Sequence, residues 1–355
     1  MVILNGIWNL ILFVIILGII VLVHEFGHFL FAKLSKTYVY EFAIGMGKKI
    51  FSFRRKNDET EYSLRLIPIG GFNQIAGENG AIEEDGIPKD RLMCSKTFLQ
   101  RFLILFAGPG FNFILTFIVL FISALIFGST TNKAIIGSVS EEYPAYEAGL
   151  REGDKILAIN NKKVNSWDDA ILIIQTSNGK ELEFKIKDSN DNTSTIKVTP
   201  KQIEDEEGNI SYVYGIAKDA TISHGFTNSI SYAWNKTGSL FNVMIYTVKC
   251  LFTGQVSVND LSGPVGIYTI VGEQAKGGIE NLLYLLAYLS INVGVINLIP
   301  FPAFDGGRIV LLLVEKIIRR PIDPKVENAI NSVGFMLLML LMLYVTGHDI
   351  FNLFS

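Results

Sequence analysis

Long apolar runs dominate the pattern of hydrophobic and polar positions along this chain. The first covers residues 7–23, with Asn9 as its polar exception, and resumes at 29–31. About 20 helical residues, each rising 1.5 Å, cross a hydrocarbon core roughly 30 Å thick. The remaining runs are 102–128, 282–299 and 329–345. The pattern therefore predicts a multi-span α-helical membrane protein with four transmembrane helices.

Residues that break helices interrupt two of these runs. Gly108, Pro109 and Gly110 lie early in the second run, and a Pro-Phe-Pro sequence at 300–302 ends the third, which resumes at 309–314. Non-helical backbone at membrane depth is tolerated only where protein buries it or where it lines a cavity. We therefore expect a functional site at these breaks rather than simple membrane anchors.

The segments between the runs carry strand and turn patterns. Residues 38–77 predict a small β element, because residues 62–67 alternate at the strand period and Gly70-Gly71 follow as turn signals. Residues 131–220 predict a soluble, β-rich α+β domain. The stretch 224–254 mixes aromatic and polar residues, which favours an interfacial amphipathic helix, with a fifth span as the alternative.

These patterns divide the chain into seven parts. They are a first transmembrane helix at 1–32, a β element and loop at 33–98, a second transmembrane helix at 99–129, a soluble domain at 130–221, an amphipathic segment at 222–278, a third transmembrane helix at 279–319, and a fourth helix with its tail at 320–355.

Composition supports the membrane class, and charge suggests an orientation. The chain has 355 residues, is 49% hydrophobic and carries a net charge of −3, so no basic excess points to nucleic acid. Lys and Arg gather within 33–101 and 316–325, and both tails outside the apolar runs have none. The positive-inside rule predicts that these basic segments are cytoplasmic, with the soluble domain and both termini outside.

One short motif carries the chemistry. The sequence His24-Glu25-Phe26-Gly27-His28 ends the first run, and on a helix its two imidazoles stack on one face, where both can bind one Zn²⁺. Glu25 beside them can accept a proton from water that the metal acidifies. The alternative is a pair of polar residues at a helix end, but ionisable groups within a span default to function.

Zinc needs a third protein ligand, and Asp305 is the candidate. It follows the Pro-Phe-Pro break, so it can lie at a depth similar to that of the histidines. The alternative is a cap for a helix beginning near Gly306. His224 and His348 are predicted to lie outside the membrane, and the separated Cys94 and Cys250 indicate buried filler rather than a metal site.

These motifs resemble those of the site-2 protease family in its single-PDZ bacterial form. The matching sequences are HEFGH at 24–28, GGF at 70–72, AGPxxNF at 107–113, GPVGI at 263–267 and NxxPxPxxDGG at 297–307. The resemblance covers nearly the whole chain in the same order. It implies a zinc metalloendopeptidase of the plasma membrane, working near the cytoplasmic side and holding one Zn²⁺ per chain.

The resemblance also implies roles for particular residues. His24, His28 and Asp305 would hold zinc, and Glu25 would be the general base. Further residues would bind substrate. They are Asn297, for the substrate backbone or developing oxyanion, and Gly70, Gly71 and Phe72, for an unwound substrate added as a strand. Gly108 and Asn112 would let helices pack closely around the site, and simple helix packing remains an alternative reading of both.

The family further implies substrates and a docking domain. Its substrates are single-span membrane proteins after a first cleavage, such as anti-sigma factors, and remnant signal peptides. The pattern PAxxAGLxxGDxIxxIN at 144–160 resembles a circularly permuted PDZ domain. Such a domain binds peptide C-termini by strand addition, with Tyr214, Gly215 and Ile216 as candidates here. A plain closing strand, or a domain that only filters substrates by size, is the alternative.

Two other functions fit parts of the sequence. A membrane-anchored PDZ scaffold with a defunct site would show a degraded motif, whereas His24, Glu25, His28 and Asp305 are all present. A transporter with an intramembrane ion site also has broken helices. It would show internal repeats, which this chain lacks, and would have no need of Glu25 as a base.

Overall fold

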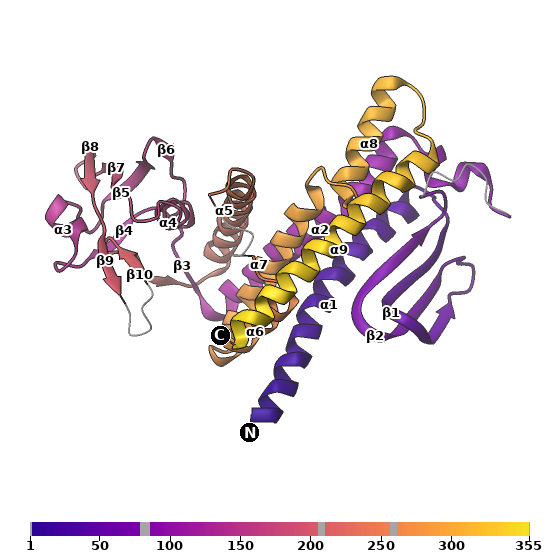
Figure 1. Ribbon diagram of the computed structural model, residues 1–355, viewed down its shortest axis with the longest axis horizontal. Helices are drawn as coiled ribbons and strands as arrows, with labels where there is room; N and C mark the ends of the chain where they lie inside the picture. Colours follow the sequence, from indigo (N-terminus) through magenta and orange to yellow (C-terminus); the bar gives the residue numbers. More distant parts are fainter. Residues whose placement is uncertain (1, 79–85, 205–209, 256–260, 355) are drawn as a thin grey trace. The chain divides into compact units, whose positions relative to one another are not determined.

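Two units make up the chain in the computed structural model, which describes residues 2–78, 86–204, 210–255 and 261–354. The first unit contains residues 1–119 and 258–355, and the second contains residues 120–257. Figure 1 labels the elements of both. The second unit is therefore an insertion in the sequence of the first.

Apolar helices form most of the first unit. They are α1 (Val2–Leu34), α2 (Phe98–Phe127), α6 (Pro264–Lys276), α7 (Ile279–Leu298), α8 (Asp305–Ile318) and α9 (Pro324–Phe354), with short 3₁₀ turns at Lys89–Arg91 and Met93–Ser95. Among the described residues, four segments are long and apolar enough to cross a membrane: Gly6–Leu34, Phe98–Phe127, Ile279–Leu298 and Pro324–Phe351. The four predicted spans agree with these segments.

The two predicted breaks have different outcomes. α2 runs without interruption through Pro109, so the expected break at Gly108–Gly110 is wrong. Proline removes one backbone donor, whereas leaving the helix in an apolar surrounding would strand several polar groups. The third run does break, because α7 ends at Leu298 and α8 begins at Asp305.

A small sheet follows α1, as the strand pattern predicts. β1 (Val39–Arg54) and β2 (Glu61–Ile75) are antiparallel, and β1 bends so that its two halves pair with different parts of β2. Phe42 lies opposite both Tyr62 and Asn73. The segments therefore lie side by side in the order 71–75, 39–44, 61–65 and 49–54, and the end of β2 forms one edge.

Helix α6 is packed among the other helices of this unit. It contacts α1, α7 and α9, and the ring of Tyr268 meets the ring of Phe13 on α1 edge to face. At its N-terminus, the backbone N–H of Gly266 donates a hydrogen bond of 2.9 Å to Asp349 Oδ2 on α9. Since the first backbone N–H groups of a helix have no partner within it, Asp349 supplies one from another helix.

Short strands and helices build the second unit. Its strands are β3 (Ser129–Thr130), β4 (Ile136–Val139), β5 (Lys155–Ile159), β6 (Lys162–Lys163), β7 (Leu182–Lys187), β8 (Thr193–Val198), β9 (Lys201–Glu204), β10 (Ile210–Val213), β11 (Ile216–Lys218) and β12 (Ile222–Ser223). Its helices are α3 (Pro144–Ala148), α4 (Trp167–Gln175) and α5 (Phe226–Phe252). One sheet has the order β6-β5-β7-β8, and β4 pairs with β11, β9 with β10 and β3 with β12.

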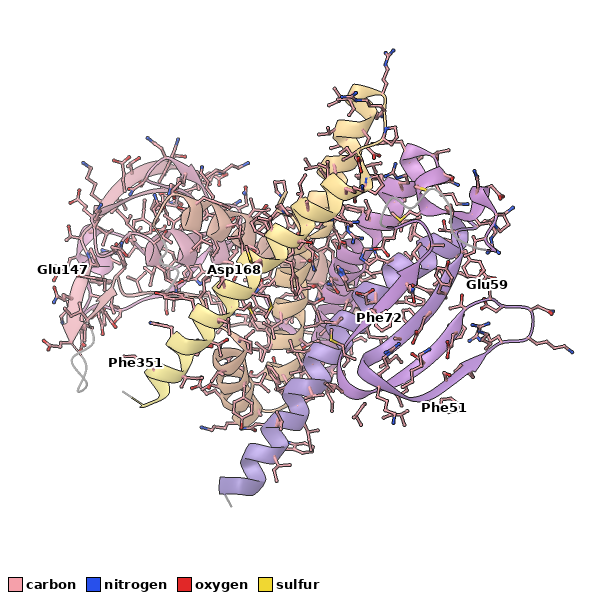
Figure 2. All side chains as sticks on the ribbon, turned by 45° about the vertical axis from the view of Figure 1, so that its right-hand side comes forward. Phe51, Glu59, Phe72, Glu147, Asp168 and Phe351 are labelled. Atoms are coloured by element: carbon pink, nitrogen blue, oxygen red, sulfur yellow. The ribbon has the colours of Figure 1, made fainter. Side chains whose placement is uncertain are left out.

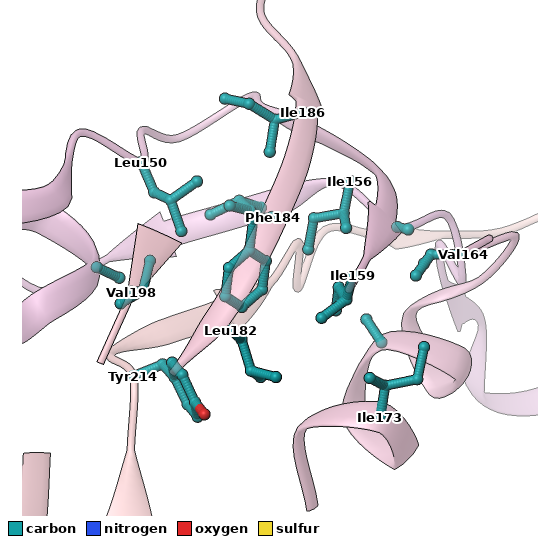
Figure 3. Packing of buried hydrophobic residues seen from close by; sticks show 14 of the residues in the cluster. Leu150, Ile156, Ile159, Val164, Ile173, Leu182, Phe184, Ile186, Val198 and Tyr214 are labelled. Carbon is teal, nitrogen blue, oxygen red and sulfur yellow. The ribbon is translucent and has the colours of Figure 1, made fainter. Parts of the chain in front are cut away.

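The core of the second unit lies between this sheet and the helices α3 and α4. Alternate side chains of β7, namely Leu182, Phe184 and Ile186, are almost fully buried. Figure 3 shows Phe184 at the centre of this packing, with Tyr214 nearby. The period of two along β7 is the expected pattern for a strand with one face in a core.

Polar contacts join α4 to α5 within the second unit. Lys236 on α5 forms an ion pair of 2.7 Å with Asp168 on α4, and Ser239 donates to the same carboxylate. Asp168 is labelled in Figure 2. The Ser166 side chain caps α4 by accepting from Asp169 N, and it also meets the Ser239 hydroxyl. α5 is therefore held to the rest of its unit by a partly buried polar network.

Candidate metal centre

Helix α1 places two histidines on one face, and α8 adds a carboxylate. His24 and His28 are one turn apart, both 9% exposed, and their Nε2 atoms are 3.2 Å apart. Asp305 Oδ2 lies 3.2 Å from His24 Nε2 and 3.4 Å from His28 Nε2. Three residues from distant parts of the sequence thus bring their ligand atoms to one point.

This triad fits a zinc ion. Zinc bonds of about 2.1 Å at tetrahedral angles place ligand atoms roughly 3.4 Å apart, close to the three distances found. Asp305 Oδ2 is buried, and no described residue gives it a hydrogen bond of ordinary geometry. His24, His28 and Asp305 form the group of His, Cys, Asp or Glu side chains that could hold a metal ion among the described residues.

The far sides of both imidazoles are held by α2. His28 Nδ1 donates to the backbone carbonyl of Ile104 at 2.8 Å, which leaves Nε2 free to bind a metal. His24 Nδ1 lies 3.3 Å from the Asn112 amide. To bind zinc through Nε2, His24 must carry its proton on Nδ1. Asn112 must then accept that proton in a hydrogen bond through Oδ1. Oδ1 has no other partner among the described residues. The sequence indicated only helix packing for Asn112.

Glycines allow α2 to lie this close to α1. A Cβ atom on Gly108 would lie 2.2 Å from His28 Nε2, and one on Gly27 would lie 2.3 Å from the carbonyl oxygen of Ala107. Both distances are too short for any side chain. Gly27 of the HEFGH motif and Gly108 of the AGPxxNF motif therefore allow α1 and α2 to pack closely beside the metal ligands.

The segment between α7 and α8 aims Asp305 at the histidines. Phe304, not Asp305, is the residue before the first turn of α8, and it makes no side-chain cap. A Cβ on Gly306 would lie 2.3 Å from Leu298 O, and one on Gly307 would lie 2.3 Å from Phe301 O. The two glycines let α8 fold back on the end of α7, and the capping alternative does not describe Asp305.

Glu25 borders a small cavity beside the triad. The cavity has a volume of about 30 Å³, which is room for a water molecule. It is lined by Glu25, His28, Asn73, Ile75, Glu78, Met93, Ile104, Leu105 and Asp305. Glu78 forms an ion pair with Arg308, one turn along α8 from Asp305. The cavity thus collects carboxylates and one amide next to the metal ligands.

The predicted substrate-binding residues of β2 lie near Glu25. A Cβ on Gly71 would lie 3.8 Å from Glu25 Cγ and 2.7 Å from Ala43 O, so only glycine fits. Gly70 has a φ of +81°, which glycine adopts without strain. Phe72, labelled in Figure 2, turns to the other face. There the guanidinium of Arg65 lies 4.5 Å above its ring.

Other predicted substrate residues lie apart from this cavity. Asn297 is the last residue but one of α7, half-buried, and is not among the described residues that line the cavity. In the second unit, Tyr214 is 3% exposed and donates through its hydroxyl to Lys180 O. Gly215 has a φ of +88°, and Ile216 begins β11. These roles stay predictions.

A second and larger hollow lies elsewhere, within the second unit. It has a volume of about 680 Å³ and is lined mainly by Ser, Thr and Asn side chains between β3, the start of α4, and α5. It contains no histidine or cysteine. We place the chemistry at the small cavity because the metal ligands and Glu25 meet there.

Comparisons with known proteins identify the family of the chain. The model of peptidase family M50 matches residues 12–341. The chain belongs to peptidase family M50. The Regulator of sigma-W protease RasP of Bacillus subtilis is 33% identical over 422 residues, covering 98% of this chain and 99% of that protein. The zinc metalloprotease RasP of Bacillus licheniformis is 34% identical with the same coverage.

A third relative extends the comparison. A protein of Clostridium perfringens is 40% identical over 334 residues, covering 93% of this chain and 95% of its own length. The family and these relatives establish a zinc metalloprotease of the site-2 type, with Zn²⁺ as its cofactor. The four apolar helices agree with a membrane protein.

Proposed function

We propose that this zinc metalloprotease hydrolyses peptide bonds within the transmembrane segments of single-span proteins that have already been cut once. Anti-sigma factors and remnant signal peptides are the substrates we propose, as parts of regulated intramembrane proteolysis. The position of His24, His28 and Asp305 supports this proposed activity. His24 and His28 lie on an apolar helix long enough to span a membrane, beside the edge of a sheet.

In the proposed mechanism, His24, His28 and Asp305 hold the zinc ion. Zinc acts when bound as a Lewis acid that polarises the scissile carbonyl and acidifies water. The Glu25 carboxylate accepts a proton from the attacking water and passes it to the leaving amine. Asn297 would contact the substrate backbone or the oxyanion.

The sheet edge can pair with backbone groups that a substrate exposes when it unwinds. A transmembrane helix hides its amides, so the segment to be cut must unwind and leave backbone groups unpaired. The end of β2, at Gly70, Gly71 and Phe72, is an edge next to Glu25, and it can pair with an unwound segment as an added strand. This supports a route by which substrate reaches the base.

For the second unit we propose a PDZ-like role in docking or filtering. Tyr214 is buried in its core, and β11, beginning at Ile216, pairs with β4 along one side within the described residues. A peptide C-terminus could add along the other side. We further propose a multi-pass plasma-membrane topology, with the termini and this unit outside, and with the metal centre near the cytoplasmic side.

Comparative membrane proteomics of wild type and Glu25→Gln tests the activity. The variant should keep its fold and its zinc while losing cleavage, because water is still polarised but its proton has no acceptor. Fragments of single-span proteins should then accumulate in the membrane of the variant. Identical fragment profiles in the two strains would refute the proposed activity.

A further inference from the structure

One amide in the small cavity has no role in the mechanism above. Asn73 lies on β2 two residues after Gly71, and its Nδ2 and Oδ1 atoms are both buried without a hydrogen-bond partner among the described residues. A buried amide left unpaired destabilises a fold, and native structures rarely keep one without a reason. The Asn73 side chain lines the small cavity beside the metal ligands.

The pleat of β2 explains why Asn73 reaches this cavity. Alternate residues of a strand face the same side. Gly71 faces Glu25, while Asn73 and Ile75 line the cavity, so these three residues share one face. Phe72 and Gln74 belong to the other face, with Phe72 beneath Arg65 and Gln74 exposed.

Most other polar groups of the cavity already have partners. Asp305 meets the two imidazoles, Glu78 pairs with Arg308, and His28 donates to Ile104 O. Glu25 is the cavity group whose proposed chemistry demands a fixed orientation. A carboxylate that takes a proton must point at the reacting water, and a second polar group nearby can hold it there.

We propose that Asn73 is a positioning residue for hydrolysis. Its amide, through one water molecule in the cavity, holds the Glu25 carboxylate in the orientation from which it accepts a proton. An amide suits this position because it donates and accepts at once, whereas a further carboxylate would add charge beside Glu25 and Asp305. The inference rests on the proposed role of Glu25 as the base.

The test uses the purified full-length enzyme and a fluorogenic single-span peptide with a trimmed outer end. Asn73→Leu keeps the size of the side chain and removes both polar atoms. We expect kcat to fall roughly 10- to 100-fold, the usual effect of losing such a supporting group. KM and zinc content should stay unchanged, and the unfolding temperature should not fall, because the variant no longer buries an amide that lacks a protein partner. Gln74→Leu, the same kind of change on the opposite face, should leave all four unchanged.

Two further variants separate positioning from other roles. Asn73→Ser keeps a donor and an acceptor, so it should recover several-fold of the rate lost in Asn73→Leu. Measured on the slow residual cleavage of Glu25→Gln over long incubations, Asn73→Leu should cause no further loss, because its effect passes through Glu25. A further loss there would mean that Asn73 contacts substrate directly and would overturn the positioning role.

The remaining outcomes are also decisive. A wild-type kcat for Asn73→Leu, or a drop in its zinc content or unfolding temperature, would remove the proposed role. If Glu25→Gln loses nearly all cleavage while Asn73→Leu keeps the wild-type kcat, only the inference about Asn73 fails. If Glu25→Gln cleaves like wild type, the proposed base fails as well.

Discussion

Gly108 occupies a position where any side chain would collide with the metal ligands. A Cβ atom there would lie 2.2 Å from His28 Nε2 and 2.9 Å from His24 Cε1. The ligand cluster therefore depends on a residue that binds nothing. Its role differs from that of Gly110 on the same helix, where a Cβ would meet the Phe106 ring at an ordinary 3.5 Å.

We therefore expect Gly108→Ala to displace the imidazoles and lower zinc affinity roughly 10- to 100-fold. Zinc content after dialysis, measured by elemental analysis, is the readout. Gly110→Ala should keep full zinc and be equally or more stable, because alanine favours a helix by about 1 kcal/mol over glycine. Full zinc in both variants would show that α2 can move away freely.

Asp305 permits a sharper test of the ligand set. Asn has the size of Asp without its charge, and Asp305 begins α8 without capping it. Asp305→Asn should therefore bind substoichiometric zinc and lose cleavage, while its thermal stability in chelator matches that of the wild-type protein without metal. Full zinc occupancy with normal cleavage would return His224 or His348 to consideration.

At the scale of elements, Asp349 links α9 to the start of α6. Its carboxylate accepts from Gly266 N, and a Cβ on Gly263 would lie 2.7 Å from Asp349 Oδ2. The glycines of GPVGI thus make room for a cap that another helix provides. Asp349→Ala should lower the free energy of unfolding by about 1 kcal/mol. Glu273→Ala, an exposed acid on α6, is the control, and an equal loss in both variants would rule out the cap.

The contact between α4 and α5 should depend on pH. Burial alone would raise the pKa of Asp168, but Lys236, with hydrogen bonds from Ser239 and Asn132, outweighs burial and holds it below its ordinary 3.8. Because the folded-state pKa is lower than the unfolded-state pKa, this stabilisation is complete above the ordinary value of 3.8 and is lost as the pH falls from there through the folded-state pKa.

Replacing Asp168 by Asn should cost about 3 kcal/mol at neutral pH, since it leaves a buried ammonium without its counter-ion. The cost should shrink toward acid pH, where the wild type is protonated too. Fluorescence of the neighbouring Trp167, which is 7% exposed, can follow unfolding. Asp191→Asn removes an exposed ion pair with Lys187 and should change little. If the loss of stability in Asp168→Asn did not vary with pH, the ion pair between Asp168 and Lys236 would not be the cause of the pH dependence.

How far the sequence could predict these elements depended on whether the information was local. Runs of apolar residues and local strand and turn patterns act within a few residues, so the four spans, the small β element and the β-rich character of the second unit were predictable. The continuity of α2 through Pro109 was not, because the apolar surroundings that favour it are not encoded near the proline.

The candidate site shows the same limit. The spacing of His24 and His28 predicted that their imidazoles share a helix face. The Pro-Phe-Pro break, and then the resemblance, pointed to Asp305. The hydrogen bond between His24 Nδ1 and the Asn112 side chain, and the cavity face of Asn73, were not predictable. Both depend on the register of segments distant in sequence, and a shift of one residue in β2 would turn Asn73 away.

For the whole molecule, the proposed topology can be tested chemically. Asn57 in the turn between β1 and β2 and Ser189 in the second unit are both exposed. In a background lacking Cys94 and Cys250, which are free cysteines, single cysteines at these positions should react with impermeant reagents from opposite sides. Asn57 should be cytoplasmic. Labelling of both from one side would overturn the arrangement of spans.

The size of the small cavity has a consequence for turnover. Each hydrolysis consumes one water molecule, and a space of about 30 Å³ holds no reserve. After every cut the enzyme must be resupplied from outside before it can cut again. We expect the steady-state rate to respond to osmotic stress, which lowers the activity of water, more strongly than the first turnover does. Hydration would then govern how quickly successive substrates are processed.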